Sequence, residues 1–169
     1  LAGLIELFSG KHEVACARVP KLVELSRNVT DISMTAIVQH SCGYLEDTIT
    51  SYERVFSANP HYASWVKYMY AYALTENKDY EKAKEFCTEQ LKQKHNWSGV
   101  EKTLYIVLAY IHKKQGSEKL AKEMFEMQRK KDGKGMSAQQ IYKGFMSKKD
   151  KSFLNDIVVT LKPFGLHDK

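Results

Sequence analysis

Two histidine–cysteine pairs are the residues in this chain whose types could bind a metal ion. His12 and Cys16 stand four positions apart and would share one face of a helix, and His40 and Cys42 follow roughly one structural repeat later. Neither pair has the tight spacing of a metal-binding motif, and cysteine as a small apolar filler with histidine at a polar helix edge explains the pattern more simply. We therefore predict neither a metal site nor a bound cofactor.

Known catalytic motifs are absent from the sequence. The chain contains no G-x-S-x-G turn, no H-E-x-x-H zinc motif, no P-loop and no dinucleotide-binding glycine motif. Gly133, Lys134 and Gly135 come nearest to a phosphate-binding loop, but the residues around them do not continue that pattern. We expect no catalytic residues and predict that the protein is not an enzyme.

Helical periodicity dominates the sequence, and its clearest example lies between residues 101 and 131. A first apolar stripe consists of Leu104, Tyr105, Leu108 and Ala109. The Gln115-Gly116-Ser117 turn ends that helix, and a second stripe follows at Leu120, Ala121, Met124 and Phe125. Two helices joined by so short a turn must lie antiparallel, so this segment is a helical hairpin.

The same hairpin pattern recurs upstream at regular intervals. Tyr70, Ala71 and Leu74 precede an Asn77-Lys78-Asp79 turn, and Tyr80 and Ala83 follow it. The small residues that begin the second helices recur at intervals of 33, 35 and 38 positions, at Ala15, Thr48, Ala83 and Ala121. A period near 34 residues indicates a repeat protein whose hairpins stack on one another. Pro20 is expected to kink the second helix of the first unit.

The best hairpin resembles a tetratricopeptide (TPR) repeat. Its bulky, large, small, turn, close-contact and aromatic positions are filled by Tyr105, Leu108, Ala109, Gly116, Ala121 and Phe125. The preceding unit matches less fully, because Cys87 stands where an aromatic residue is usual. The resemblance implies an all-α, right-handed α-solenoid of about four TPR-like hairpins with C-terminal capping helices, and a non-enzymatic adaptor or scaffold that binds a protein partner.

A second, local resemblance points to RNA-processing factors. The segment 51–56, Pro60 and the pair Trp65 and Tyr68 resemble half-a-TPR (HAT) repeats, although Tyr72 stands where an acidic residue is expected. This resemblance implies the alternative function of an RNA-associated scaffold. The basic C-terminal third would then contact phosphates, and exposed tyrosines would stack on unpaired bases.

The chain divides into two predicted parts. A TPR-like repeat region covers residues 1–131, in units 1–28, 29–61, 62–99 and 100–131, and a basic linker with a helical extension covers residues 132–169. Within the extension, residues 152–161 form an amphipathic helix with Phe153, Ile157 and Leu161 on one face. This helix either caps the last hairpin or folds back into the groove of the solenoid, and the sequence leaves both open.

The groove of such a solenoid is lined by the first helix of each hairpin, so the residues outside its packing stripe are the predicted binding residues. Trp65, Tyr68 and Tyr72 are spaced i, i+3, i+7 on one helix face. The complete predicted set is Ile37, His40, Trp65, Tyr68, Tyr72, Ile106, Tyr110, Lys113 and Lys114. This set predicts an aromatic groove with a basic rim.

Charge and cysteine content suggest the partner and the compartment. A net charge of +6 is compatible with an acidic protein or peptide partner and permits nucleic acid without favouring it. Three scattered cysteines predict no disulfide framework and so an intracellular, reducing compartment, the cytoplasm first and the nucleus as the alternative. No apolar run is long enough to insert into a membrane, and the sequence leaves the oligomeric state open.

Overall fold

The computed structural model describes residues 2–93, 98–130, 133, 135–143 and 150–168. These residues form eleven α-helices and one 3-10 turn, with no β-strand among them, which confirms the predicted all-α class. The helices are α1 Ala2–Phe8, α2 His12–Ala17, α3 Val19–Leu25, α4 Val29–Ser41, α5 Leu45–Ala58, α6 Ser64–Glu76, α7 Tyr80–Leu91, α8 Ser98–Lys114, α9 Glu118–Lys130, α10 Ala138–Lys143 and α11 Ser152–Leu161, followed by η1 Lys162–Phe164.

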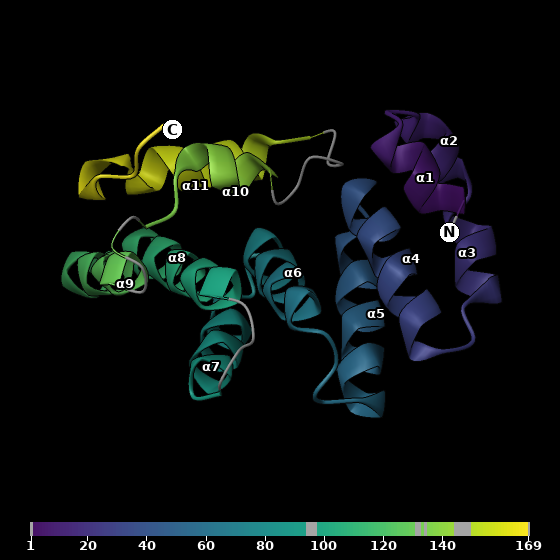
Figure 1. Ribbon diagram of the computed structural model, residues 1–169, viewed down its shortest axis with the longest axis horizontal. Helices are drawn as coiled ribbons and strands as arrows, with labels where there is room; N and C mark the ends of the chain where they lie inside the picture. Colours follow the sequence, from purple (N-terminus) through teal and green to yellow (C-terminus); the bar gives the residue numbers. More distant parts are fainter. Residues whose placement is uncertain (1, 94–97, 131–132, 134, 144–149, 169) are drawn as a thin grey trace.

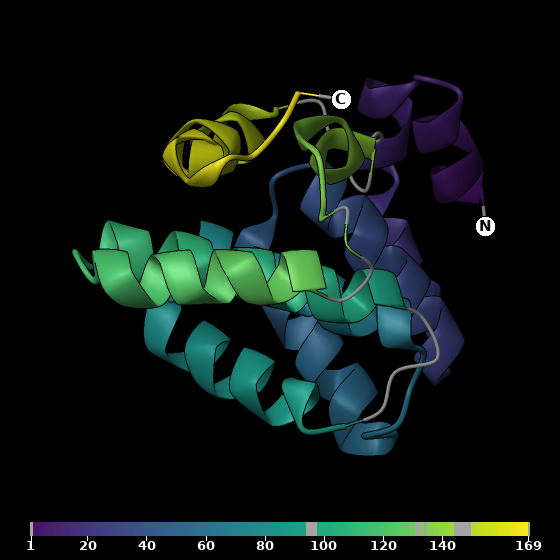
Figure 2. The same ribbon diagram turned by 60° about the vertical axis from the view of Figure 1, so that its left-hand side comes forward.

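Three consecutive helical hairpins form the body of the molecule, as the repeat pattern predicts for its last three units, and the first predicted unit forms the three short helices α1–α3. They are α4 with α5, α6 with α7, and α8 with α9, and neighbouring hairpins pack through α5 against α6 and through α8 against both α6 and α7. Helices α1–α3 lie at one end of this row, against α4. Helices α10 and α11 lie across α8 and α9 in both views (Figures 1 and 2). The predicted boundary at 131/132 falls outside the described residues, so the division into two parts stays a prediction.

The hairpin turns share one backbone geometry. In each, a residue with positive φ follows the first helix: Gly10 (79°), Gly43 (85°), Lys78 (63°) and Gly116 (77°). The next residue donates its N–H to a carbonyl five residues back, from Lys11 to Glu6, Tyr44 to Gln39, Asp79 to Leu74 and Ser117 to His112. This is the Schellman arrangement, which satisfies the last carbonyls of a helix while the chain reverses. Glycine is favoured at its left-handed position because it has no Cβ.

Lys78 is therefore a strained residue at a position that suits glycine. We predict that Lys78→Gly raises the free energy of unfolding by roughly 0.5–1 kcal/mol, because a left-handed conformation costs a side-chain-bearing residue about that much more than glycine. Urea unfolding measures the change as a higher midpoint with an unchanged slope. Lys78→Ala is the matched control and should leave the midpoint near that of the wild type. Equal midpoints for all three proteins would contradict the prediction.

The core contains clustered aromatic side chains and, at close helix contacts, alanines. Phe56 of α5, Tyr70 of α6 and Phe86 of α7 form a cluster with ring centroids 4.8–5.6 Å apart. Where α8 approaches α9, Ala109 and Ala121 are fully buried, and small side chains there let the two backbones come close. Cys87 is also fully buried, and burial raises the pKa of its thiol. The neighbouring Phe86 supplies the aromatic group that the repeat pattern places at Cys87.

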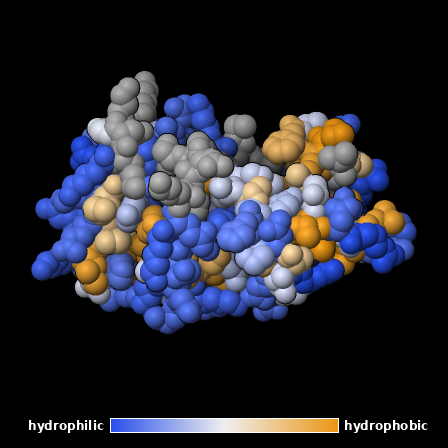
Figure 3. All heavy atoms as spheres, turned by 60° about the horizontal axis from the view of Figure 1, so that its bottom comes forward, coloured by the Kyte–Doolittle hydropathy of each residue, from blue (hydrophilic) through white to orange (hydrophobic). Residues whose placement is uncertain are grey.

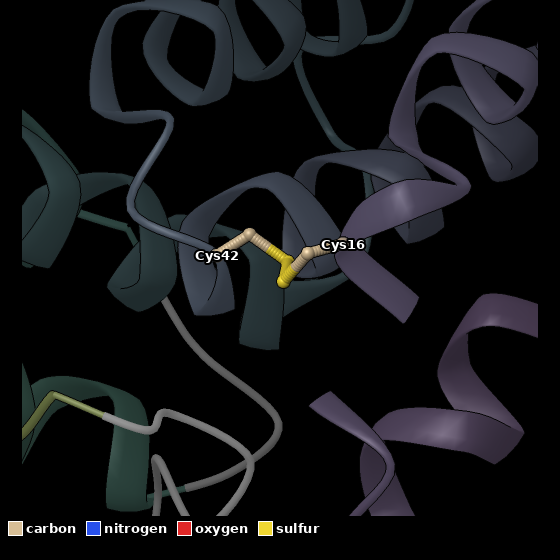
Figure 4. Close-up of a disulfide and its surroundings, with 2 residues drawn as sticks. All are labelled: Cys16 and Cys42. Carbon is tan, nitrogen blue, oxygen red and sulfur yellow. A yellow bond between two sulfur atoms is a disulfide. The ribbon is translucent and has the colours of Figure 1, made fainter. Parts of the chain in front are cut away.

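The N-terminal unit has its own small core. Leu4, Leu7, Ala15 and Val19 pack with Val38 of α4, apart from the main core. The chain breaks into α2 and α3 at Pro20, which occupies the first turn of α3, where its missing N–H is not needed. A disulfide joins Cys16 of α2 to Cys42 at the end of α4, with their Cα atoms 5.6 Å apart (Figure 4). The sequence predicted no disulfide framework, whereas the structure contains this single bond, with Cys87 as the free thiol among the described residues.

The disulfide should hold the N-terminal unit on the solenoid. Cys16 and Cys42 are 26 positions apart, and closing a loop of that size is worth about 3 kcal/mol through the entropy of the unfolded chain. We predict that the double variant Cys16→Ser/Cys42→Ser speeds amide hydrogen exchange in α1–α3 and leaves α6–α9 unchanged. Dithiothreitol should reproduce this effect in the wild type and have none in the variant. Uniformly faster exchange along the chain would contradict a local role for the bond.

Exposed apolar side chains gather at the same end of the molecule. Ile5 and Phe8 of α1 are 67% and 69% exposed, and Val14, Val23 and Leu25 of α2 and α3 are also exposed. Figure 3 shows a largely hydrophilic face on the side of α7 and the end of α5, with hydrophobic residues both at the end that holds α1–α3 and at the opposite end. None of the helices in the described part of the chain has the length and apolarity that crossing a bilayer would require.

Candidate functional site

The candidate site is the side of α6 and α8 that presents Tyr72, Tyr110 and Lys114, here called the groove face. Helix α11 lies on it. The ring of Phe153 stands edge-on to Tyr72 and Tyr110, with centroids 6.2 Å and 5.8 Å away and interplanar angles of 83° and 88°. Edge-to-face geometry is a favoured arrangement of aromatic pairs. With α11 in place, Tyr72 is only 1% exposed and Tyr110 only 3%.

A polar contact lies beside the aromatic one. Asp156, three positions after Phe153, accepts a hydrogen bond of 2.6 Å from the Tyr110 hydroxyl and one of 2.8 Å from the Lys114 ammonium. Burial raises the pKa of Tyr110, and the hydrogen bond to Asp156 raises it further, so this tyrosine stays a neutral donor. Partial burial would raise the pKa of Asp156, but the hydrogen bonds from Lys114 and Tyr110 outweigh it and hold that pKa below its usual value.

The other predicted groove residues lie in several environments. Ile106 is fully buried in the main core, and Ile37 is half-buried between the two cores. His40 is also buried, and its Nε2 lies 3.0 Å from Glu76 Oε2, which links α4 to α6. Lys113 forms an ion pair with Glu118 at the start of α9 and stands 5.4 Å from the Phe164 ring centroid. Lys113 thus faces α9 and η1, whereas Lys114 faces α11.

Trp65 and Tyr68 remain half-buried at the start of α6, on the same helical stripe as Tyr72. Burial raises the pKa of Tyr68. Among the predicted aromatic residues of the groove, these two keep part of their surface accessible while α11 is in place. The predicted aromatic residues therefore fall into two groups. Tyr72 and Tyr110 are covered by α11, and Trp65 and Tyr68 are partly open.

The histidine–cysteine pairs meet without forming a metal site. The Cys16–Cys42 disulfide borders a cavity of about 580 Å³ whose wall also includes His12, Leu45 and Glu76. Bonded sulfurs are not thiolates, and a thiolate is what a zinc ion binds. Across the parts of the chain that the structure describes, no three histidine, cysteine or acidic side chains are grouped to hold a metal.

Two residues of the site escaped prediction. Asp156 is an acidic residue three positions after Phe153. An acidic residue at this spacing on a largely apolar helix indicates that the helix contacts a cation or a hydroxyl donor. Phe164 of η1 packs against Phe125 of α9 with centroids 6.1 Å apart. Helix α11 therefore lies on the groove face while η1 covers the last hairpin, which combines the two placements that the sequence left open.

The stacked helical hairpins define the class of the protein as an α-solenoid. The family model described as tetratricopeptide repeat matches residues 66–94, which include α6 and α7. This match supports membership of the tetratricopeptide-repeat superfamily, as the sequence pattern predicts. No curated protein and no solved structure is similar enough to count as a match. The local HAT resemblance stays a prediction.

The Asp156 contact predicts an acid-sensitive α11. A carboxyl group whose pKa is depressed by folding stabilises the folded form above its unfolded pKa of about 3.9, and this contribution is lost as the pH falls through the folded value. Amide protection of α11, corrected for intrinsic exchange, should hold from pH 7 to 5 and decline below about pH 4. Asp156→Asn should lower the protection already at pH 7 and remove that decline. An acid decline of equal size in this variant would show that Asp156 is not the responsible group.

Proposed function

We propose that this protein is a non-enzymatic scaffold that binds a protein partner through the groove face and the adjoining stripe of Trp65 and Tyr68. Tetratricopeptide repeats generally serve protein interaction, and the family match places one such repeat at α6 and α7. The main support for the proposal is the position of α11. The face predicted to bind a partner already binds this amphipathic helix of its own chain. Three of its predicted residues, Tyr72, Tyr110 and Lys114, make the contacts.

The chemistry of the face suits protein binding. Large aromatic side chains supply most interface energy because they bury much area with few torsions to restrain. Trp65 and Tyr68 offer such anchors at the partly open end of the stripe, and Tyr72 and Tyr110 offer them beneath α11. These side chains stand on helices and are already buried or half-buried, so little side-chain entropy is lost when a partner binds.

RNA binding stays a prediction of the sequence alone. A phosphate-binding surface needs lysines and arginines gathered with few acids among them. On α9 the exposed cations are mixed with exposed acids: Lys119, Lys122, Arg129 and Lys130 with Glu118, Glu123 and Glu126. This mixture favours a solvated helix face, so protein binding is the function proposed here.

The proposed function predicts which substitutions release the partner. Proteins that co-purify with the wild type should be retained at least about tenfold less by Trp65→Ala/Tyr68→Ala, because aromatic anchors are the usual hot spots of an interface. Leu120→Ala is the matched control, since Leu120 is an exposed apolar residue on α9, away from the stripe. Circular dichroism should show equal helicity in all three proteins. Full retention by the folded double variant would remove the groove from consideration as the binding site.

A further inference from the structure

We propose that the groove face is a receptor for an amphipathic helix of a partner protein that carries an aromatic residue and, three positions later, an acidic residue, and that this helix takes the place of α11. The inference rests on the proposed function and names the class of partner. In this view α11 is an internal copy of the ligand, and its contacts show what the face selects.

The first requirement is an aromatic anchor. Phe153 fits between Tyr72 of α6 and Tyr110 of α8, so its position is defined by two hairpins rather than one. Burial raises the pKa of Tyr72 as well as that of Tyr110, so both rings stay uncharged across the physiological range. An aliphatic residue at this place would lose both edge-to-face contacts.

The second requirement is a carboxylate. Tyr110 and Lys114 both donate to Asp156, and the Lys114 ammonium also stands 5.4 Å from the Tyr110 ring centroid. Because this polar pair is half-shielded by α11, a lysine or arginine in the ligand would place like charges together at low solvation. One turn of helix separates the two anchors, which fixes the direction in which a ligand helix can bind.

The surroundings of α11 would also allow a partner helix to replace it. Val159 of α11 is 67% exposed, and a cavity of about 450 Å³ lies between α10 and α11, next to Tyr142 and Val158. Helix α11 contributes four buried side chains to the main core, Leu154, Ile157, Val158 and Leu161, and these contacts set the cost of its release. Release costs the contacts of α11 itself, together with the hydrogen bond from the Ala138 N–H to the His167 carbonyl if the tail follows. That cost lowers the apparent affinity for a competing helix without abolishing its site.

A peptide of the chain's own sequence tests this inference directly. The probe is a fluorescent synthetic peptide of residues 151–168, and the receptor is the full chain with Phe153→Ala/Asp156→Ala, which weakens α11. The peptide should bind this released variant at least about tenfold more tightly than the wild type, because the competent state is then more populated. Adding Lys114→Glu to the released variant should weaken binding about tenfold, since a charge-assisted hydrogen bond is lost. Lys119→Glu, an exposed lysine on α9, is the matched charge control and should change nothing.

A charge exchange supplies the decisive comparison. A peptide with Asp156→Lys should bind the Lys114→Glu receptor better than the unmodified peptide does, and the original receptor worse. If this reversal is missing although the unmodified peptide binds, the acidic requirement is overturned. If the released variant is folded and no peptide binds it, exchange is overturned, while the Trp65 and Tyr68 experiment still decides the proposed function separately. If the released variant loses the helicity of α8 and α9, α11 is a permanent structural cap and the inference fails.

Discussion

A complete reversal of the chain within a few residues, repeated along the solenoid, is the constraint on which the rest of the structure depends. Each reversal needs one residue in the left-handed region, at Gly10, Gly43, Lys78 and Gly116. So tight a turn makes the two helices antiparallel and close, and this closeness suits the small, fully buried side chains of Ala109 and Ala121. A pair of helices cannot cover both of its apolar flanks alone, so every hairpin must be stacked on another.

The hairpins could be predicted because their signals are local. Leu104, Leu108 and Phe125 repeat with the period of a helix, and Gly116 marks the turn within the same short window. Lys78 shows the limit of this reasoning, because its left-handed backbone is imposed by packing on either side rather than by its own preference. The turn was still placed, since the apolar stripes on both sides fixed where the chain had to reverse.

Contacts between distant segments were harder to predict. Cys16 and Cys42 belong to different units, and nothing in their spacing indicates that α2 meets the end of α4 there. The helix over 152–161 was predicted. Its amphipathic pattern indicates that one face is buried but not which surface buries it. In the same way, the sequence indicates that Tyr72 and Tyr110 need a partner but does not indicate which segment supplies it. Only the three-dimensional arrangement pairs Phe153 with these two rings.

The connection between α10 and α11 has a consequence for any competing helix. Only residues 144–151 lie between the two helices in the sequence. A helix that belongs to the same chain as its binding surface, and follows it so closely in sequence, experiences an effective concentration in the millimolar range there. A free partner at about micromolar concentration therefore begins with a disadvantage of about a thousandfold. Occupancy of the groove would then depend on the local concentration of the partner. A partner held nearby by a second binding site, or assembled into arrays, would compete better than a dilute one.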